Sequence, residues 1–238
     1  MSEAVYKDLS FKSEKEYKTG KNSKLPVLTI GVLALQGAFR EHIVALKKLK
    51  VKTVEIRFPE QLADIDGLII PGGESTTIFK LIKKYKFKDA LDKFNEQRKP
   101  IFGTCAGLII LAKKVLNDNP SLGYIDITVD RNAYGRQIDS FEQLVEFKCR
   151  QGLNGKKFNA IFIRAPKIKE KGLKVEELCS LDGVTVLAQQ ENILVCSFHP
   201  ELMDDLRIHK YFIDMVYRAK YYSNKDMAKN RENNKIIL

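Results

Sequence analysis

Apolar blocks alternate with amphipathic stretches along most of the chain. The apolar run 27–35 predicts a buried strand, and the apolar residues at helical spacing within 39–49 predict a helix after it. The same alternation continues to residue 220. Further strands are predicted at 51–58, 67–70, 101–103, 125–129, 144–148, 160–163, 184–188 and 193–198. Further helices are predicted from residue 75, in the segment closed by Lys99-Pro100, over 106–115 and over 207–220.

This order of elements predicts the fold class. Apolar strands separated by helices are typical of an α/β protein with three layers, in which a mostly parallel central sheet is flanked by helices on both faces. Ligands in such folds bind outside the carboxyl ends of the strands. Three loops follow apolar strands and are expected to meet at that edge: 71–74, 103–107 and 198–201.

Length and composition add limits to this prediction. The chain has 238 residues, of which 44% are hydrophobic and 30% charged, as expected for one globular domain. The predicted division is a flexible N-terminal extension over 1–26, a catalytic domain over 27–220 and a flexible basic tail over 221–238. No stretch reaches the roughly 18 apolar residues of a membrane span, and the first residues do not resemble a secretory or organellar signal. We therefore expect a cytoplasmic protein without membrane contact.

The net charge of +11 raises the possibility of nucleic-acid binding, but its location favours another interpretation. Residues 1–24 contribute +2 and residues 218–238 contribute +4, so six of the eleven excess charges lie in these two terminal segments. A solvated fringe explains this pattern, and we predict no nucleic-acid partner. The four cysteines and three histidines lack metal-ligand spacing, so neither a metal nor a cofactor is predicted. Cys149, Cys179 and Cys196 are expected to be small buried hydrophobic residues.

Cys105 is the candidate nucleophile. It lies in Gly103-Thr104-Cys105-Ala106-Gly107, between a predicted strand and a predicted helix, and the glycines two positions away on each side resemble the layout of a nucleophile elbow. A helix beginning directly after the residue favours the thiolate. Taken alone, a buried structural cysteine beside a packing turn explains the same string.

His199 and Glu201 are the candidate base and its orienting carboxylate. They follow another strand, in Phe198-His199-Pro200-Glu201. A cysteine nucleophile needs a base that takes its proton and returns it to the leaving group, and that base needs a partner that fixes its tautomer. An ordinary packing histidine is the alternative. His42 and His209 are weaker candidates for the base, because both lie in predicted helices rich in charged residues.

Gly72-Gly73 can present backbone N–H groups to a substrate where a bulky residue would block it. The predicted oxyanion hole is therefore the N–H of Gly73 together with that of Ala106. A plain turn explains the diglycine equally well. The joint occurrence of the three loops in this predicted topology favours the catalytic interpretation.

These motifs resemble the class I glutamine amidotransferases, which have a flavodoxin-like fold. Within that superfamily the chain most resembles the glutaminase subunits of pyridoxal phosphate synthases, from about Thr29 to Ala219. The strings that carry the resemblance lie at 31–37, 68–77, 102–107, 131–137, 139–141, 162–166 and 198–201. Such a glutaminase hydrolyses glutamine and passes the ammonia to a separate synthase subunit, which builds pyridoxal phosphate from a pentose phosphate and a triose phosphate.

The resemblance implies a role for specific residues of this chain. It implies a Cys105, His199 and Glu201 triad that acts through a glutamyl thioester, and a hetero-oligomeric complex with the synthase. The residues that it implies for glutamine binding are Gly72, Gly73, Glu74, Ser75, Arg131, Ile163 and Arg164. An arginine suits the substrate carboxylate, and carboxylate or carbonyl oxygens suit its ammonium. Gln36 lies at the same strand edge and is a candidate for the synthase contact.

Two other functions remain as alternatives. The chain could be the amidotransferase subunit of another pathway, of the histidine or anthranilate type, although the strings at 71–76 and 163–166 argue against it. The net charge alone suggests a noncatalytic regulatory or nucleic-acid-binding protein on the same fold. Neither a fold nor a charge requires Cys105, His199 and Glu201 at these three loop positions, and this disfavours the noncatalytic alternative.

Overall fold

The computed structural model describes residues 27–131, 140–148 and 157–221. The predicted extension over 1–26, the tail from 222 and Cys149 lie outside these ranges, as do the family string from 132 to 137 and Asp139. Tyr221, which the prediction assigned to the tail, is the last residue of the final helix. The structure therefore covers almost all of the predicted catalytic domain.

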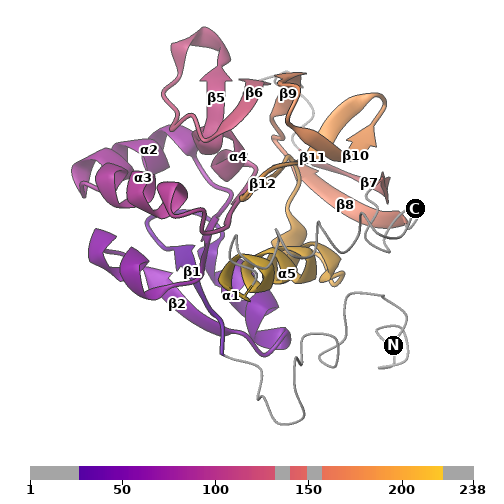
Figure 1. Ribbon diagram of the computed structural model, residues 1–238. Helices are drawn as coiled ribbons and strands as arrows, with labels where there is room; N and C mark the ends of the chain where they lie inside the picture. The colour runs from indigo at the N-terminus through magenta and orange to yellow at the C-terminus, as the bar shows by residue number, and fades with distance from the viewer. Residues whose placement is uncertain (1–26, 132–139, 149–156, 222–238) are drawn as a thin grey trace, which may run out of the picture.

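In the described residues, the central sheet has nine strands in the order β2-β1-β3-β4-β12-β11-β10-β7-β8 (Figure 1). The parallel half consists of β2 (Lys52–Ile56), β1 (Thr29–Leu33), β3 (Gly67–Ile70), β4 (Ile101–Thr104) and β12 (Ile193–Cys196). The antiparallel half continues with β11 (Val184–Gln190), β10 (Glu176–Leu181), β7 (Ser140–Phe147) and β8 (Lys157–Ile163). The parallel half has the 2-1-3-4-5 strand order of flavodoxin-like folds, with β12 in fifth place.

Helices cover both faces of this sheet, which confirms the predicted three layers. The helices α1 (Phe39–Lys48) and α5 (Arg207–Tyr221) lie on one side of the parallel strands, and α2 (Ser75–Lys84), α3 (Lys88–Glu96) and α4 (Ala106–Leu111) lie on the other (Figure 1). Alternate side chains of each strand point to opposite faces of the sheet and pack in two separate cores. Val32 and Phe102 pack in the core that contains α5, whereas Leu33 and Ile101 pack in the core that contains α2 and α3.

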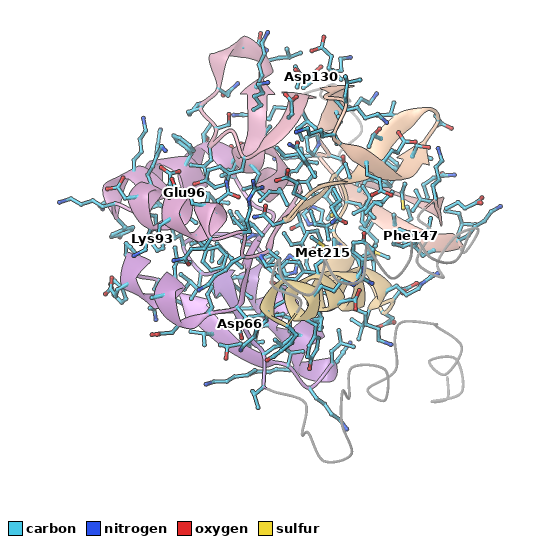
Figure 2. The ribbon with its side chains drawn as sticks, viewed as in Figure 1. Asp66, Lys93, Glu96, Asp130, Phe147 and Met215 are labelled. Atoms are coloured by element: carbon cyan, nitrogen blue, oxygen red, sulfur yellow. The ribbon has the colours of Figure 1, made fainter. Side chains whose placement is uncertain are left out.

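The antiparallel half packs on the α5 side. Phe147 of β7 and Met215 of α5 belong to the same core, and Figure 2 shows both side chains on that side of the molecule. Cys179 and Cys196 are fully buried in this core, as predicted for structural cysteines. None of the helices in the described ranges has the length and apolar character that a bilayer span requires.

Several elements differ from the prediction, mostly outside the parallel half. A second sheet consists of β5 (Ala112–Val115), β6 (Ile125–Asp130) and β9 (Lys167–Lys171). Its strand β5 takes the place of the end of the helix that was predicted over 106–115. The apolar run into Ala112 concealed this change, since strand and helix segments cannot be told apart in short apolar runs. β9 and β10 were not predicted. Between the predicted strands at 51–58 and 67–70 the chain forms a 3-10 helix, η2 (Pro59–Asp64).

Candidate active site

The backbone at Cys105 is sharply bent. Cys105 has φ 47° and ψ −98°, a conformation that a non-glycine residue rarely adopts, and it joins β4 directly to α4. The flanking glycines leave no room for a side chain: a Cβ at Gly103 would lie 2.7 Å from the Gly107 carbonyl oxygen, and one at Gly107 would lie 2.1 Å from the Ile70 carbonyl oxygen. The Gly-x-Cys-x-Gly pattern therefore reflects a tight strand-to-helix turn that presents Cys105 at the end of β4.

His199 and Glu201 form a buried pair beside this turn. Both lie after β12, where Pro200 begins the short 3-10 helix η4 (Pro200–Leu202). The His199 Nδ1 lies 2.8 Å from Glu201 Oε1, and both residues are buried. Because the Nδ1–H of His199 donates to this carboxylate, the other ring nitrogen of His199 is available to the Cys105 thiol. β4 and β12 are neighbours in register, and this brings the two loops together.

The electrostatics of the pair favour a charged imidazole. Burial alone would lower the pKa of His199, but its hydrogen bonds with Cys105 and Glu201 outweigh burial and raise the pKa to about 10. The pKa of Glu201 is affected oppositely: burial raises it, and interactions with His42 and His199 lower it below the usual value. An ionised carboxylate beside a protonated imidazole is the arrangement that orients a catalytic histidine.

The loop after β3 closes the other side of the cysteine. A Cβ at Gly72 would lie 2.5 Å from His199 Cε1, so only glycine fits there. Gly72 N–H donates to Thr104 Oγ1 at 2.9 Å, and its carbonyl accepts from Ala38 N–H at 3.0 Å. Gln36 Oε1 accepts from the N–H of Glu74 at 2.9 Å. The predicted loop is therefore held on both sides of Gly73; the oxyanion role of Gly73 and Ala106 stays a prediction.

The end of β8 reaches the same place from the far edge of the sheet. Cys105 Sγ lies 3.8 Å from the Ile163 carbonyl oxygen, and His199 N–H donates to the Ile161 carbonyl at 2.8 Å. The antiparallel half therefore curls back to meet the carboxyl ends of the parallel strands. Arg164 follows Ile163 with φ 44° and is exposed.

Two of the residues predicted to bind glutamine face each other. An Arg131 Nη2 lies 3.9 Å from Glu74 Oε1, and the Arg131 Nη1 donates to Asn119 Oδ1 at 3.3 Å. Arg131 and Glu74 carry the opposite charges that the two ends of an amino acid require. Ser75 is buried at the first position of α2. Their roles in binding stay predictions.

The sequence interpretation missed two buried groups next to the triad. His42 is fully buried, with its Nε2 3.3 Å from Glu201 Oε2 and 3.1 Å from Thr104 Oγ1. The sequence positions of His42 and Thr104 could have predicted that both are buried, although not which groups they contact. His42 precedes the apolar Leu46 by one helical turn, and Thr104 follows Phe102 by two strand positions, so both belong to the face that packs under α5.

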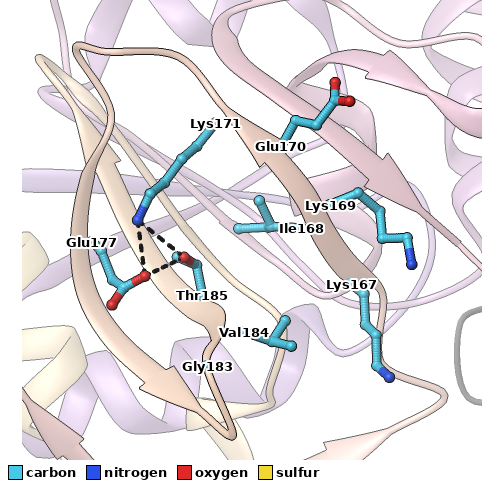
Figure 3. Close-up of a pocket in the computed structure, with 9 residues that line it drawn as sticks. All are labelled: Lys167, Ile168, Lys169, Glu170, Lys171, Glu177, Gly183, Val184 and Thr185. Atoms are coloured by element: carbon cyan, nitrogen blue, oxygen red, sulfur yellow. Dashed lines mark hydrogen bonds and ion pairs between the residues drawn. The ribbon is translucent and has the colours of Figure 1, made fainter.

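A separate pocket of about 430 Å³ lies away from these residues. It is lined by β9 and by the β10–β11 hairpin (Figure 3): Lys167, Ile168, Lys169, Glu170, Lys171, Glu177, Gly183, Val184 and Thr185. In Figure 3, Lys171 reaches across to Glu177 and Thr185. The pocket shares no residue with the predicted site, so it does not account for the glutamine chemistry.

Comparison with known proteins decides the family. Residues 32–218 match the SNO glutamine amidotransferase family. The chain belongs to that family. Among curated relatives of this amidotransferase, the pyridoxal 5'-phosphate synthase subunit PdxT of Thermotoga petrophila is 51% identical over 79% of this chain and 100% of its own length. The protein of the same name from Bacillus velezensis is 53% identical over 82% of this chain and 97% of its own length.

Solved structures agree with this assignment. A glutamine amidotransferase crystal structure has 46% identity and a TM-score of 0.74, and the match covers 79% of this chain and 98% of that one. A putative GMP synthase protein from Thermoplasma acidophilum has 17% identity and a TM-score of 0.60, over 87% and 100% of the two chains. The second likeness concerns the fold alone. The predicted family and fold class are confirmed.

Proposed function

We propose that the chain hydrolyses L-glutamine to L-glutamate and ammonia through Cys105, His199 and Glu201. The observation that carries the proposal is the buried His199–Glu201 pair, with Nδ1 and Oε1 2.8 Å apart, next to a cysteine held at the bent end of β4. A cysteine, a base and an orienting carboxylate on three loop positions constitute the machinery of thiol acyl transfer.

The reaction follows from this geometry. The Cys105 sulfur attacks the side-chain amide carbon of glutamine, and the N–H groups of Gly73 and Ala106 hold the resulting oxyanion. The imidazolium of His199 gives its proton to the departing nitrogen, so ammonia leaves and a glutamyl thioester remains. His199 then takes a proton from water, and the hydroxide attacks the thioester to release glutamate and the thiolate. The sum is one glutamine and one water converted to glutamate and ammonia.

Substrate recognition uses the charges beside the cysteine. In this proposal Arg131 and Arg164 bind the substrate carboxylate, while Glu74 and the Ile163 carbonyl accept from its ammonium. The contact of Arg131 with Glu74 and of Cys105 with the Ile163 carbonyl supports it. Gly72, Gly73 and Ser75 complete the proposed glutamine-binding set. The Ile163 carbonyl oxygen lies 3.8 Å from Cys105 Sγ, so the proposed ammonium subsite is next to the reacting sulfur.

The ammonia is delivered to a separate subunit that forms pyridoxal 5'-phosphate. Support comes from relatives of about 50% identity that are named subunits of pyridoxal 5'-phosphate synthase and are covered almost completely by this chain. Gln36, whose side chain holds Glu74 in the loop, is a candidate for the contact with that subunit. A cytoplasmic location fits this role and stays a prediction.

The test combines the chain with its candidate synthase. Glutamate release is measured with and without the synthase, for the unchanged chain and for Cys105→Ala. We expect the substitution to lower the rate by at least about 10³-fold without unfolding the protein. Activity that survives it would overturn the mechanism. Adding glutamine, a pentose phosphate and a triose phosphate should give pyridoxal phosphate absorbance, and a glutaminase that yields none would contradict the pathway.

A further inference from the structure

Two histidines lie under the candidate triad, and the proposed reaction gives neither a direct part. His42 of α1 and His209 of α5 are both fully buried, and His42 Nδ1 lies 3.0 Å from His209 Nε2. Their rings pack against Phe102, with ring centroids 6.3 and 6.4 Å from that phenyl group. Two imidazoles in an apolar core are costly unless their nitrogens are paired, so each nitrogen needs an explanation.

Burial keeps both histidines neutral. Desolvation lowers the pKa of His42, and it lowers the pKa of His209 to about 3, with the neighbouring His42 acting in the same direction. Each ring therefore carries a single N–H near neutral pH. The question is which nitrogen of each ring holds the proton.

The carboxylate of Glu201 decides the tautomer. Its Oε1 accepts from His199, while Oε2 is buried, makes no hydrogen bond within the described residues and lies 3.3 Å from His42 Nε2. An ionised oxygen needs a donor, so the His42 proton belongs on Nε2. His42 Nδ1 then accepts, and the Nε2–H of His209 must be the donor. His209 Nδ1, which has no partner in the described ranges, is left with only a lone pair.

A second branch links His42 to the substrate loop. His42 Nε2 also lies 3.1 Å from Thr104 Oγ1, and the same hydroxyl accepts from the N–H of Gly72. Thr104 directly precedes the candidate nucleophile. One imidazole nitrogen therefore lies between the orienting carboxylate, the residue before Cys105 and the loop before Gly73.

We propose that His42 is a positioning residue of the glutaminase: it shares its single Nε2–H between Glu201 Oε2 and Thr104 Oγ1 and, through Thr104, holds the Gly72 loop, with His209 fixing its tautomer. The proposal rests on the proposed function. The carboxylate of Glu201 is then held from both sides, by His199 on one oxygen and by His42 on the other. Second partners of this kind fix the orientation of groups that touch the substrate.

The pH dependence follows from the donor. The His42 N–H favours the ionised form of Glu201, so its removal raises the pKa of Glu201 and moves the acid limb of activity to higher pH. The groups that share this environment come from several elements: His42 and Glu41 of α1, His209 of α5, His199 before η4, Cys105 before α4, and Cys196 of β12. His42 is the one that contacts the free carboxylate oxygen.

The first experiment needs no substitution. Imidazole nitrogen chemical shifts of the unchanged chain report the tautomer of each of its three histidines. We expect His42 to carry its proton on Nε2 and its lone pair on Nδ1. A His42 protonated on Nδ1 would overturn the proposal, because its Nε2 could then not donate to Glu201.

The second experiment compares substitutions in the complex with the synthase. His42→Phe keeps a ring of similar size and removes both nitrogens, whereas His42→Gln keeps an N–H donor. We expect His42→Phe to lower kcat about 10- to 100-fold, as measured for lost outer-shell partners of metal sites, with little change in KM. The acid limb should move to higher pH, and His42→Gln should recover part of kcat.

Alkylation of Cys105 by iodoacetamide, followed against pH, provides a readout that does not need glutamine turnover. His42→Phe should shift that profile in the same direction. If the unchanged chain releases no glutamate while the shift is present, the proposed function fails and the role of His42 stands. An unshifted profile with unchanged kcat would leave His42 a purely structural residue.

Asn192→Ala is the matched control. Asn192 is a buried polar residue beside β12, at the end opposite the site, and its side-chain nitrogen donates to Asn95 Oδ1 and to the Lys99 carbonyl at 3.1 Å each. Its loss should lower thermal stability without moving either pH profile. If His42→Phe does not fold, Thr104→Val and Thr104→Ser test the second branch: Val should lower kcat and Ser should restore it, and equal rates would contradict the link.

Discussion

The parallel and antiparallel halves of the central sheet contribute to the site in different ways. In the parallel half, Cys105 follows β4 and His199 lies in the loop after β12, so the reacting side chains lie beyond the ends of neighbouring strands. In the antiparallel half, β8 contributes backbone carbonyls, of Ile161 and Ile163, to the same place. Reactive side chains thus come from one half and positioning atoms from the other.

The two halves also differ in how much ionised charge they bury. Glu201 in the parallel half is surrounded by His199 and His42 in the core, and both of its oxygens are buried. Glu177 in the antiparallel half carries an equally dense set of partners at the surface. We expect the carboxylate of Glu201 to matter for catalysis and the carboxylate of Glu177 to make only a modest contribution to stability. Matched substitutions in the two halves test this difference.

The largest effect is expected for Glu201→Gln. The pKa of His199 is raised by its interactions with Cys105 and with Glu201, so removing the Glu201 charge should lower that pKa below about 10. The tautomer of His199 is no longer fixed, and the loss in kcat should reach about 10²–10⁴-fold. Steady-state glutamate release in the presence of the synthase, with a histidine titration by NMR, measures both changes. Unchanged kcat would remove Glu201 from the mechanism.

The parallel half was also the part whose elements and site loops could be predicted from the sequence. Each predicted strand end there carried a short motif whose residue types have a physical reason: glycine at 103 and 107 because no Cβ fits, and His199 and Glu201 because they pair. The elements and the loops could therefore be predicted together. Their proximity followed from the rule that parallel strands bring their carboxyl ends to one edge.

The antiparallel half could be predicted less well, because its elements and contacts leave no clear pattern in the sequence. β9 has the sequence Lys-Ile-Lys-Glu-Lys, in which Ile168 alone is buried, so neither propensity nor periodicity indicates a strand. The carbonyls of Ile161 and Ile163 are backbone groups, which every residue has, so residue type gives no sign of their role at the site. The contact of His42 with Glu201 depends on α1, η4 and the end of β4 meeting in space, and a strong helical pattern around residue 42 cannot reveal it.

A stability effect is expected for Phe162→Ala in β8. Phe162 is fully buried, stacks on Phe141 with centroids 4.8 Å apart and meets Phe198, the residue before His199, at 5.7 Å. Its truncation should lower the free energy of unfolding by about 3–5 kcal/mol. Urea unfolding checks this value. Phe58→Ala, at a side chain that is more than half exposed, is the control and should change it by less than about 0.5 kcal/mol.

If the antiparallel half only positions atoms, Phe162→Ala should also lower kcat under conditions where the protein is folded. The reason is that β8 holds His199 through the Ile161 carbonyl. A destabilised protein with full kcat would mean that the backbone contacts of β8 are not needed for the geometry of the triad.

Substrate binding should respond to Arg131→Gln. The guanidinium lies near Glu74 and is proposed to bind the glutamine carboxylate. We expect KM for glutamine to rise about 10- to 100-fold with kcat changed little, since one charge-assisted bond contributes roughly 1.5–3 kcal/mol. Arg98→Gln is the control, because Arg98 pairs with Glu191 at the opposite end of the strands. Equal KM values for both variants would exclude Arg131 from the subsite.

The smallest effect is expected for Glu177→Gln, the counterpart of Glu201→Gln. Partial burial acts in the opposite direction, but hydrogen bonds from Lys148 and from the Thr185 and Lys171 drawn in Figure 3 lower the pKa of Glu177 to about 2. A lowered carboxyl pKa means that the ionised form stabilises the fold. Its contribution is present above the ordinary value of 4.5 and is lost as the pH falls toward 2. Water screens these exposed lysines, so the substitution should cost less than about 1 kcal/mol.

This last variant completes the comparison of the two halves. Thermal unfolding at pH 7 and at pH 3 should show a smaller difference between Glu177→Gln and the unchanged chain at the lower pH, because the Glu177 carboxyl is then protonated in the unfolded chain and must ionise on folding. Glutamate release with the synthase should be unchanged, since Glu177 lies in β10 and faces the pocket of β9 rather than Cys105. A large fall in kcat would instead connect that surface to the reaction, and the division of labour between the halves would be wrong.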